Sequence, residues 1–565
     1  QHRGFSQKQR GEYFQITEIR ITDSETGKAL GKPEGTYITL SGESLSGFSA
    51  HYPEMTEEFA QELRKLLPEE GLVFVAGLGN QHITPDALGV QTVDKIIATR
   101  HLQKELAQEE EEELAEVVEF NPFYKYRVYL KDKKGSPYSI SRPEEFLSHK
   151  SIERRKKQGL SIDESDIPVN RSYLDKVEQC GVELLHCSKW NNTVLVQTSD
   201  TTLMDKVSGL PCVLSVRKVA TYDDEIPTPD PDRRDIVNDR DADPSTMGFF
   251  EGYHNDLVNR YLNNSYKYGS GNTQIKMMNG ISLHDQGYRG NGITIAVIDG
   301  GFYNADVIPY FKDVKVLGTK DFAMKGGDVY GEEEHGTMVL SCIATNCRGK
   351  LIGTAPEATF WLLRSEDGHT EQMVEEDNWC AAIEFADSVG VDVVNTSLGY
   401  TKYDNPADNV RYWEQDGQTR LISKSASMVA SKGMILCQSA GNEGDETWKR
   451  IGCPADAKDI LTVGAVDSDR ENTTFSSIGN SYDGRIKPDV CAMGSNCAVI
   501  DQYGDLTYAS GTSFSSPILC GMVACYWQAH PEMTALQVME NIRKISDNAE
   551  HPDNVFGYGI PDFSK

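Results

Sequence analysis

The sequence lacks the features that mark membrane-spanning and nucleic-acid-binding proteins. No apolar run reaches the roughly 18 residues that cross a bilayer, so we expect no membrane span. Basic residues are outnumbered, 56 against 86 acidic ones, which gives a net charge of −30. This excess of negative charge argues against nucleic acid or an anionic membrane as the main partner, although it also serves simple solubility.

Signals for metals and disulfides are also sparse. No paired C-x-x-C pattern is present, so the sequence predicts no structural metal site. Twelve cysteines in 565 residues are too few for a disulfide scaffold. We expect most of them to be buried free thiols. One or two bridges stay open if the protein is exported, for instance among Cys453, Cys491 and Cys497.

The chain begins at Gln1, without an initiator methionine or a signal-like apolar core. We therefore expect a processed or trimmed N-terminus, with any export signal outside the given sequence. A length of 565 residues exceeds one ordinary hydrophobic core, and about three folded domains are expected.

Composition and periodicity divide the chain into five stretches. Residues 1–105 form a small α/β segment, and residues 106–120 are an acidic linker. Residues 121–222 are a second folded unit. Residues 223–245, rich in proline, aspartate and arginine, read as an exposed linker in which we expect a maturation cut. Residues 246–565 form the largest domain.

The second unit carries no pattern typical of catalysis, because it has no histidine–acid pair and no cysteine in a reactive context. Its periodicity predicts a small α+β sandwich in which strands and helices alternate. The expected elements are strand 126–130, helix 143–157, helix 173–180, strands 182–190 and 193–197, helix 202–208 and strand 213–219.

Motifs in the N-terminal stretch resemble the spore germination protease family. In that family the aspartate of the T-P-D-A-L-G motif is thought to be catalytic, which corresponds to Asp86 here. A second aspartate that the family needs has no counterpart in this chain, so the resemblance implies a truncated, catalytically incompetent copy in which Asp86 is structural. The competing hypothesis is an active aspartic-type spore protease. The matching motifs are Gly31-Lys32-Pro33-Glu34-Gly35-Thr36-Tyr37-Ile38-Thr39-Leu40, Gly77-Leu78-Gly79-Asn80, Thr84-Pro85-Asp86-Ala87-Leu88-Gly89 and Thr99-Arg100-His101-Leu102.

The largest domain contains the residues of a nucleophilic site. Ser513 lies among small residues before an apolar helical run, where a serine needs a base, an orienting acid and an oxyanion donor. Asp299 ends a predicted buried strand, and His335 opens an apolar helix. Asp299, His335 and Ser513 follow the acid–base–nucleophile order of subtilisin. Asn442, after a predicted strand, supplies an amide that can donate to the developing oxyanion.

Together, these motifs resemble the subtilisin-like serine proteases over the whole last domain. The resemblance implies an α/β fold with a parallel sheet, and it implies that residues 121–222 are an N-terminal inhibitory propeptide. The alternative for residues 121–222 is a spacer or interaction domain. The motifs are Ala296-Val297-Ile298-Asp299-Gly300-Gly301, His335-Gly336-Thr337, Ser397-Leu398-Gly399, Ser439-Ala440-Gly441-Asn442, Lys487-Pro488-Asp489-Val490 and Gly511-Thr512-Ser513.

The resemblance also assigns roles residue by residue. Ser513 would be the nucleophile, His335 the general base and acid, Asp299 the orienting acid, and Asn442 an oxyanion donor. Ser397, Leu398 and Gly399 would pair with the substrate backbone and wall the primary specificity pocket. Three further residues are assigned to substrate binding: Gly441; Gly452, which would leave that pocket open for a large side chain; and Glu443, which would tolerate a basic or polar group near its mouth.

The chain departs from the family pattern at a few positions. Gly300 replaces the usual serine or threonine after the aspartate, and Ser515 replaces a common alanine. Neither change removes a catalytic group, so both put the fine tuning of the activity in doubt rather than the activity itself. The loop 344–350 is shorter than the loop that often helps to hold calcium. A structural calcium therefore has no clear motif, and the chemistry needs no cofactor.

The sequence thus predicts a self-processing serine endopeptidase that acts on protein or peptide substrates and is held by its own propeptide. The alternative is a catalytically silent binding module of the same fold. An extracellular or periplasmic location is expected from the propeptide, although the germination-protease resemblance points to the inside of a spore.

Overall fold

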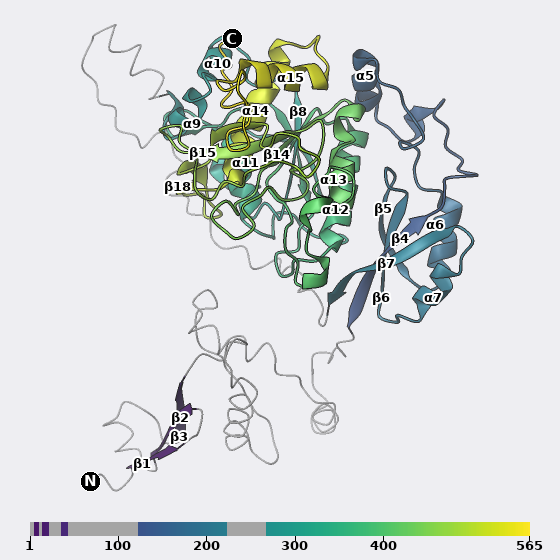
Figure 1. Ribbon diagram of the computed structural model, residues 1–565, viewed down its shortest axis with the longest axis vertical. Coiled ribbons are helices and arrows are strands. Elements are labelled where there is room, and N and C mark those ends of the chain that lie inside the picture. Colours follow the sequence, from purple (N-terminus) through teal and green to yellow (C-terminus); the bar gives the residue numbers. More distant parts are fainter. Residues whose placement is uncertain (1–4, 11–13, 22–34, 43–121, 223–266) are drawn as a thin grey trace. The chain divides into compact units, whose positions relative to one another are not determined.

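The computed structural model describes residues 5–10, 14–21, 35–42, 122–222 and 267–565 (Figure 1). The chain divides into two compact units, residues 1–118 and 119–565. In the first unit, β1 (Phe5–Arg10), β2 (Phe14–Ile21) and β3 (Gly35–Gly42) form an antiparallel sheet in that order. Asp86, the acidic linker 106–120 and the linker 223–245 lie outside the described residues.

The predicted α+β sandwich is confirmed in residues 122–222. Its antiparallel sheet has the order β5-β6-β4-β7. The first helix begins at His149 rather than at residue 143, because a separate 3-10 turn occupies Pro143–Glu145 and Ser148 Oγ caps the helix by accepting from the Ser151 N–H. The elements are β4 (Phe123–Leu130), α5 (His149–Gln158), α6 (Arg171–Glu178), β5 (Glu183–Ser188), β6 (Thr193–Thr198), α7 (Leu203–Ser208) and β7 (Val213–Tyr222).

The last domain is built on a seven-stranded sheet of order β16-β15-β14-β13-β8-β12-β9, in which every neighbouring pair is parallel. The predicted parallel α/β fold is therefore confirmed. The strands are β8 (Thr294–Asp299), β9 (Lys315–Asp321), β12 (Thr359–Arg364), β13 (Val393–Thr396), β14 (Ile435–Ser439), β15 (Leu461–Val466) and β16 (Val490–Met493), with two small antiparallel pairs, β10 (Asn346–Cys347) with β11 (Leu351–Ile352) and β17 (Cys497–Ile500) with β18 (Leu506–Ala509).

Helices cover both faces of this sheet, as parallel sheets require. Side chains of β8 alternate between the faces: Ile295 and Val297 belong to one core cluster, and Ala296 and Ile298 belong to the other. The first cluster includes α11 (His335–Ala344), α14 (Thr512–Ala529) and α15 (Ala535–Ile545). The second includes α12 (Val374–Val389) and α13 (Leu421–Ala426). Two short helices, α9 (Asn272–Lys276) and α10 (Ile281–Asp285), precede the sheet.

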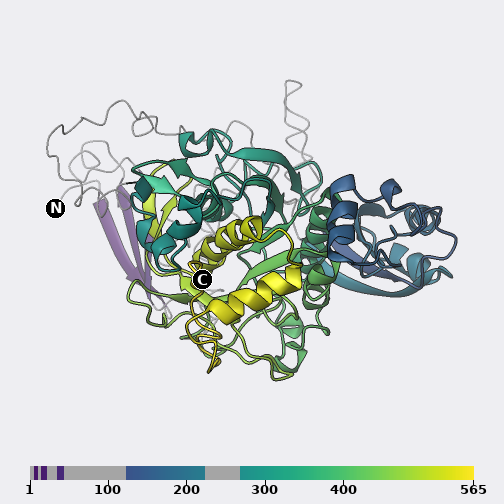
Figure 2. The ribbon, with the colours of Figure 1, turned by 90° about the horizontal axis from the view of Figure 1, so that it is seen from above.

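The α+β sandwich packs directly on helix α12 of the last domain (Figures 1 and 2). Trp190 from the turn between β5 and β6, together with Leu195 and Tyr222 from the sheet, belongs to the same buried cluster as Trp379 and Ile383 from α12. Helices α6 and α7 cover the opposite face of the small sheet (Figure 1). Helix α12 is therefore enclosed between two sheets.

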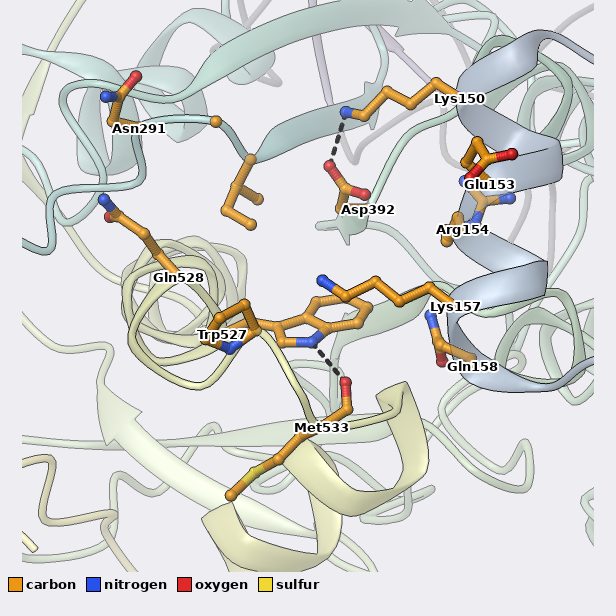
Figure 3. Close-up of a pocket in the computed structure, with 13 residues that line it drawn as sticks. Lys150, Glu153, Arg154, Lys157, Gln158, Asn291, Asp392, Trp527, Gln528 and Met533 are labelled. Atoms are coloured by element: carbon orange, nitrogen blue, oxygen red, sulfur yellow. Dashed lines mark hydrogen bonds and ion pairs between the residues drawn. The ribbon is translucent and has the colours of Figure 1, made fainter.

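Helix α5 forms a second contact with the last domain. Lys150 Nζ lies 2.7 Å from Asp392 Oδ2 and 2.6 Å from Thr294 Oγ1, at the beginning of β8. A cavity of about 490 Å³ remains beside this ion pair, where Trp527 Nε1–H donates to the carbonyl oxygen of Met533 at 3.0 Å (Figure 3).

All twelve cysteines are free thiols in the structure, and the bridges considered among Cys453, Cys491 and Cys497 are not formed. Each of these three is buried on a different element or loop, and burial raises the pKa of each thiol. The expectation of buried free thiols is correct for most of the set. The suggestion of a bridge among these three is wrong.

Candidate active site

The predicted catalytic residues lie at the carboxyl edge of the seven-stranded sheet, where the strand order reverses. Strand β8 lies between β12 and β13, so the chain proceeds from β8 to opposite sides of the sheet. Ligands of open parallel sheets bind outside such a switch point. Asp299 is the last residue of β8, and Ser397 follows the last residue of β13.

Asp299 and His335 are in direct contact. His335 Nδ1 lies 2.7 Å from Asp299 Oδ1, which also accepts from the Gly300 N–H at 2.9 Å. The close approach of α11 to the end of β8 depends on Gly336, since a Cβ there would lie 2.2 Å from the Gly301 carbonyl oxygen and 3.0 Å from Asp299 Cβ. A residue without a side chain after His335 therefore allows the imidazole to reach the carboxylate.

The charge around His335 raises its pKa above the usual 6.5. Burial disfavours the imidazolium, but the attraction and hydrogen bond of Asp299, with smaller contributions from Glu333 and Glu334, outweigh burial. The side chain remains 35% exposed toward the cleft. An imidazole so placed can accept a proton and is stabilised once it carries one.

Ser513 is the second residue of α14 and is joined to the end of β13 by reciprocal hydrogen bonds. Ser513 Oγ donates to the Ser397 carbonyl oxygen at 3.3 Å, and Ser397 Oγ donates to the Ser513 carbonyl oxygen at 2.9 Å. Among the described contacts there is no hydrogen bond from Ser513 to His335, although the rings of His335 and Phe514 lie 6.0 Å apart. Catalytic hydrogen bonds are often long in unliganded enzymes and tighten with substrate.

Asn442 has its amide oriented by the start of α14. Its Oδ1 accepts from the Thr512 N–H at 2.8 Å and from Thr512 Oγ1 at 3.0 Å. The oxygen is thereby fixed on Thr512, and Nδ2 is left as the donor. Asn442 itself is exposed at the cleft. It belongs to the loop that follows β14 and lies beside Ser513, although the two residues are far apart in the sequence.

Every residue predicted for substrate binding lines one small cavity of about 210 Å³, together with Asn442 and Ser513. Glu443 lies in its wall, where its carboxylate accepts from Ser477 Oγ at 2.8 Å and from Thr401 Oγ1 at 3.4 Å. A Cβ on Gly441, whose φ is +110°, would lie 2.5 Å from Glu443 Oε2. The predicted members are Ser397, Leu398, Gly399, Gly441, Glu443 and Gly452.

A second cavity of about 430 Å³ adjoins the first, shares Ser397 and Leu398 with it, and was missed by the sequence reasoning. Asp299 and His335 form part of its wall, and most of its other lining residues are acidic. The acidic run that begins at Glu366 was the available signal. Sequence alone could not show that this run folds back beside the catalytic residues.

The described residues contain neither a membrane-crossing helix nor a cluster of metal ligands. No helix there is long and apolar enough to cross a membrane. No group of three or more His, Cys, Asp or Glu side chains in that part of the chain is arranged to hold a metal ion.

Comparison with known proteins matches three parts of the chain to families. Residues 290–559 match the Subtilase family of peptidase S8. Residues 125–232 match the peptidase S8 propeptide domain of Bacteroidota. Residues 1–123 match the germination protease family, peptidase A25.

Individual relatives are similar at modest identity. Subtilisin NAT from Bacillus subtilis subsp. natto is 29% identical over 327 residues, which cover 57% of this chain and 75% of that protein. Serine protease AprX from Bacillus subtilis (strain 168) is 27% identical over 300 residues, 48% of this chain and 65% of that protein. The solved structure of the MycP3 protease from the type VII (ESX-3) secretion system is 22% identical and covers 51% of this chain and 86% of that one, with a TM-score of 0.40.

The family matches and the relatives define the class of protein: it is a serine endopeptidase. More particularly, residues 290–559 are a subtilase domain, preceded by a propeptide domain of the same peptidase family and by a stretch similar to germination proteases.

Proposed function

We propose that Ser513, His335 and Asp299 form the catalytic triad of this endopeptidase. Ser513 Oγ attacks the scissile carbonyl carbon while His335 Nε2 accepts the hydroxyl proton and later gives it to the leaving amine. Asp299 holds Nδ1–H, fixes the tautomer and stabilises the imidazolium. Water then attacks the acyl-enzyme with the same base and restores Ser513.

Asn442 is the side-chain donor to the oxyanion in this proposal, together with the backbone N–H of Ser513. Fixing Oδ1 on Thr512 leaves Nδ2 free to donate to the negative oxygen, without reorganisation during the reaction. The single observation that carries the assignment is the 2.7 Å contact between His335 and Asp299 in the cleft wall that leads to Ser513.

The small cavity of about 210 Å³ is proposed as the primary specificity pocket. Glu443 has no Lys or Arg ion pair among the described residues, so a basic or polar side chain of the substrate suits it. Gly452 keeps the wall open, since it contributes no side chain. A peptide library tests this point: a strict preference for alanine or glycine before the cut contradicts the assignment.

We further propose that the chain is a zymogen that processes itself. The last strand of the propeptide domain is held at the cleft rim: the Thr221 N–H donates to Gln372 Oε1 at 2.8 Å and Gln372 Nε2 donates to the Thr221 carbonyl oxygen at 3.1 Å. Gln372 follows directly on Glu371, which lines the second cavity. Strand β7 therefore ends beside the proposed active site, which supports the role of an inhibitory propeptide.

Intact mass measured over time, on wild type beside Ser513→Ala, tests both proposals. We expect the wild type to lose roughly its first 220–245 residues, at the proline-rich linker where cleavage concentrates, while Ser513→Ala stays whole. Equal cutting of both proteins contradicts self-processing. If neither is cut, labelling by a serine-directed phosphonate separates a locked zymogen from the silent binding module.

The remaining expectations stay proposals. The chemistry of the triad uses no cofactor, and no ligand set for a structural calcium is assigned. An extracellular or periplasmic location is proposed from the propeptide domain, which accompanies exported members of the family. Fractionation of the native host, with the processed chain followed by antibody, tests the location.

A further inference from the structure

The second cavity, of about 430 Å³, adjoins the proposed primary specificity pocket. Ser397 and Leu398 line both this cavity and the proposed primary pocket, and His335 and Asp299 lie in its wall. A substrate strand laid along Ser397–Gly399 therefore presents a side chain to each cavity in turn.

The lining of this cavity is rich in acidic residues. Its lining contains no Lys and no Arg, and its only other titratable residues are two histidines, His335 and His369. Seven carboxylate side chains line it: Asp299, Glu333, Glu366, Asp367, Glu371, Glu375 and Asp404. Within the described part of the chain, none of the seven forms an ion pair with Lys or Arg within 4.0 Å.

Neutral donors bind two of these carboxyl groups. Glu366 accepts from Ser365 Oγ at 2.6 Å and from the Tyr400 hydroxyl at 2.7 Å. Glu375, only 1% exposed, accepts from the backbone N–H of Asp367 at 2.9 Å and of Gln372 at 3.2 Å. These hydrogen bonds fix the orientation of the two carboxyl groups. Because no cation of the described residues pairs with them, burial raises the pKa of Glu366 to about 7 and that of Glu375 well above its usual range.

Several other buried carboxylates of the same chain form ion pairs with Lys or Arg. Asp377 pairs with Arg127 at 2.6 Å, and Asp387 pairs with Arg154 at 2.6 Å. Lys487 lies 2.8 Å from Asp489. Buried charges are costly unless they are paired, so a group of buried and half-buried acids without a cation is the exception that needs a cause.

Asp299 supplies an independent sign of a missing partner. Its side chain is only 1% exposed, and its Oδ2 atom is buried with no hydrogen-bond partner among the described residues, although Oδ1 is fully used. Unsatisfied buried oxygens are uncommon in native proteins, and this one belongs to the cavity wall.

The propeptide brings one cation toward the same region. Lys125 on β4 is 3% exposed, with its ammonium 4.8 Å from the centroid of the Tyr222 ring. Burial lowers its pKa to about 8, although the negative field of Asp367, Asp321 and Glu375 acts against that shift. Release of the propeptide removes this cation and leaves the cavity without it.

We propose that this acid-lined cavity is a specificity subsite that binds the side chain of an arginine or lysine on the amino-terminal side of the scissile bond. The five guanidinium donors of arginine suit several carboxylates at once. The chain offers such a ligand itself, since Arg233 and Arg234 lie in the linker where the maturation cut is expected. The inference rests on the proposed catalytic site, because it needs a peptide bound in that register.

Paired peptides test the subsite on the processed enzyme. Quenched fluorescent peptides that differ only by Arg or Gln at each of the four positions before the cut are compared by kcat/KM. We expect Arg to be preferred by about tenfold or more at one position, as a charged hydrogen bond to a carboxylate implies. No preference at any position, with the neutral peptides still cleaved, overturns the subsite and leaves the catalytic proposal standing.

Variants of the lining residues test whether the preference for Arg over Gln arises in the cavity. Glu371→Gln and the double change Glu371→Gln with Asp404→Asn should reduce the ratio of kcat/KM for the Arg peptide to that for the Gln peptide by about fivefold or more. Glu446→Gln is the matched control, because Glu446 is an exposed acid paired with Lys402 outside the cavity. An equal loss of preference in the control overturns the assignment.

Binding measurements distinguish failure of the subsite proposal from failure of the catalytic proposal. If no peptide is cleaved, labelled Arg and Gln peptides are compared by fluorescence anisotropy on the same protein. Tighter binding of the Arg peptide, weakened by Glu371→Gln, supports the subsite although the catalytic proposal fails. Equal affinity for the two peptides overturns the subsite without any turnover.

Discussion

Arg127 of strand β4 donates two parallel hydrogen bonds to Asp377 of helix α12, from Nε to Oδ1 at 2.7 Å and from Nη2 to Oδ2 at 2.6 Å. Both side chains are almost completely buried, at 3% and 4% exposure. This pair is one of several that join the propeptide domain to the subtilase domain, and it identifies α12 as the helix through which the propeptide is held.

Replacing Arg127 with Leu should weaken retention of the propeptide strongly. The change leaves Asp377 buried without its cation, which costs about 3–5 kcal/mol for a buried pair. Size-exclusion chromatography of the processed protein measures the effect, as loss of the propeptide from the enzyme peak. Glu183→Ala is the control, because it removes the exposed pair with Lys325 at the same interface and should leave co-elution unchanged.

Retention of the propeptide should also depend on pH, through two groups that act in opposite directions. Burial lowers the pKa of His186 to about 4 from 6.5, against the hydrogen bond of its Nε2 to Asn378 Oδ1. His186 of the released propeptide therefore takes up a proton between pH 6.5 and 4, whereas His186 in the complex stays neutral. Association of the propeptide with the enzyme weakens as pH falls through this range. Burial raises the pKa of Glu384 to about 7 from 4.5, so this group strengthens association as pH falls from 7 toward 4.5.

Single substitutions separate these two effects. His186→Gln keeps a donor for Asn378 and removes the acid-dependent weakening, so the complex should resist pH 5 better than wild type. Glu384→Gln mimics the protonated carboxyl at every pH, so its complex should be tighter than wild type at pH 7.5 and should gain little further affinity at pH 5. Affinity is compared at pH 5 and pH 7.5. Relative to wild type, the ratio of the affinity at pH 5 to that at pH 7.5 should rise for His186→Gln and fall for Glu384→Gln, and a change of both ratios in the same direction contradicts the assignment.

The pH dependence of peptide cleavage should follow His335. The base must be neutral to accept the Ser513 proton, and its pKa is raised above 6.5, so kcat/KM should increase with pH through a midpoint above 6.5. Asp299→Asn removes the main cause of that shift, should move the midpoint down, and should lower kcat by about 10⁴. Glu334→Gln, which removes only a minor contribution, should leave the midpoint nearly unchanged.

Asn442→Ala should lower kcat by about 10²–10³ while KM changes little, because the amide acts on charge that exists only in the transition state. Steady-state kinetics on one neutral peptide provide the measurement. Thr512→Ser, which retains both donors to Asn442 Oδ1, is the matched control and should keep most of the activity. A large rise in KM at constant kcat would instead assign Asn442 to ground-state binding.

Local sequence patterns predicted the framework of the site well. A fully buried strand ending at Asp299, a helix opening at His335 and a helix starting at the Ser513 motif are all confirmed. Each rests on short-range periodicity, which a single segment can display. The carboxyl-edge position of Asp299 followed from the parallel sheet alone.

Features assembled from distant segments could not be predicted in the same way. The second cavity joins Glu333, the loop around Glu366 and Glu371, and Asp404, and no periodicity connects these segments. The disulfide suggestion failed for the same reason, because pairing depends on distances between Cys453, Cys491 and Cys497 that spacing does not contain. Orientation of the Asn442 amide likewise depends on Thr512, seventy residues away.

The charge around helix α12 changes when the propeptide is released. Asp387, which is fully buried, takes its cations from Arg154, Arg155 and Lys189, all of them on the propeptide domain. Release of the propeptide removes these three cations from Asp387. The carboxylate then attracts the basic groups back over a distance of about a Debye length, and dissolved salt shortens that reach. Whether a released propeptide returns to its own enzyme is therefore set by ionic strength as well as by fit.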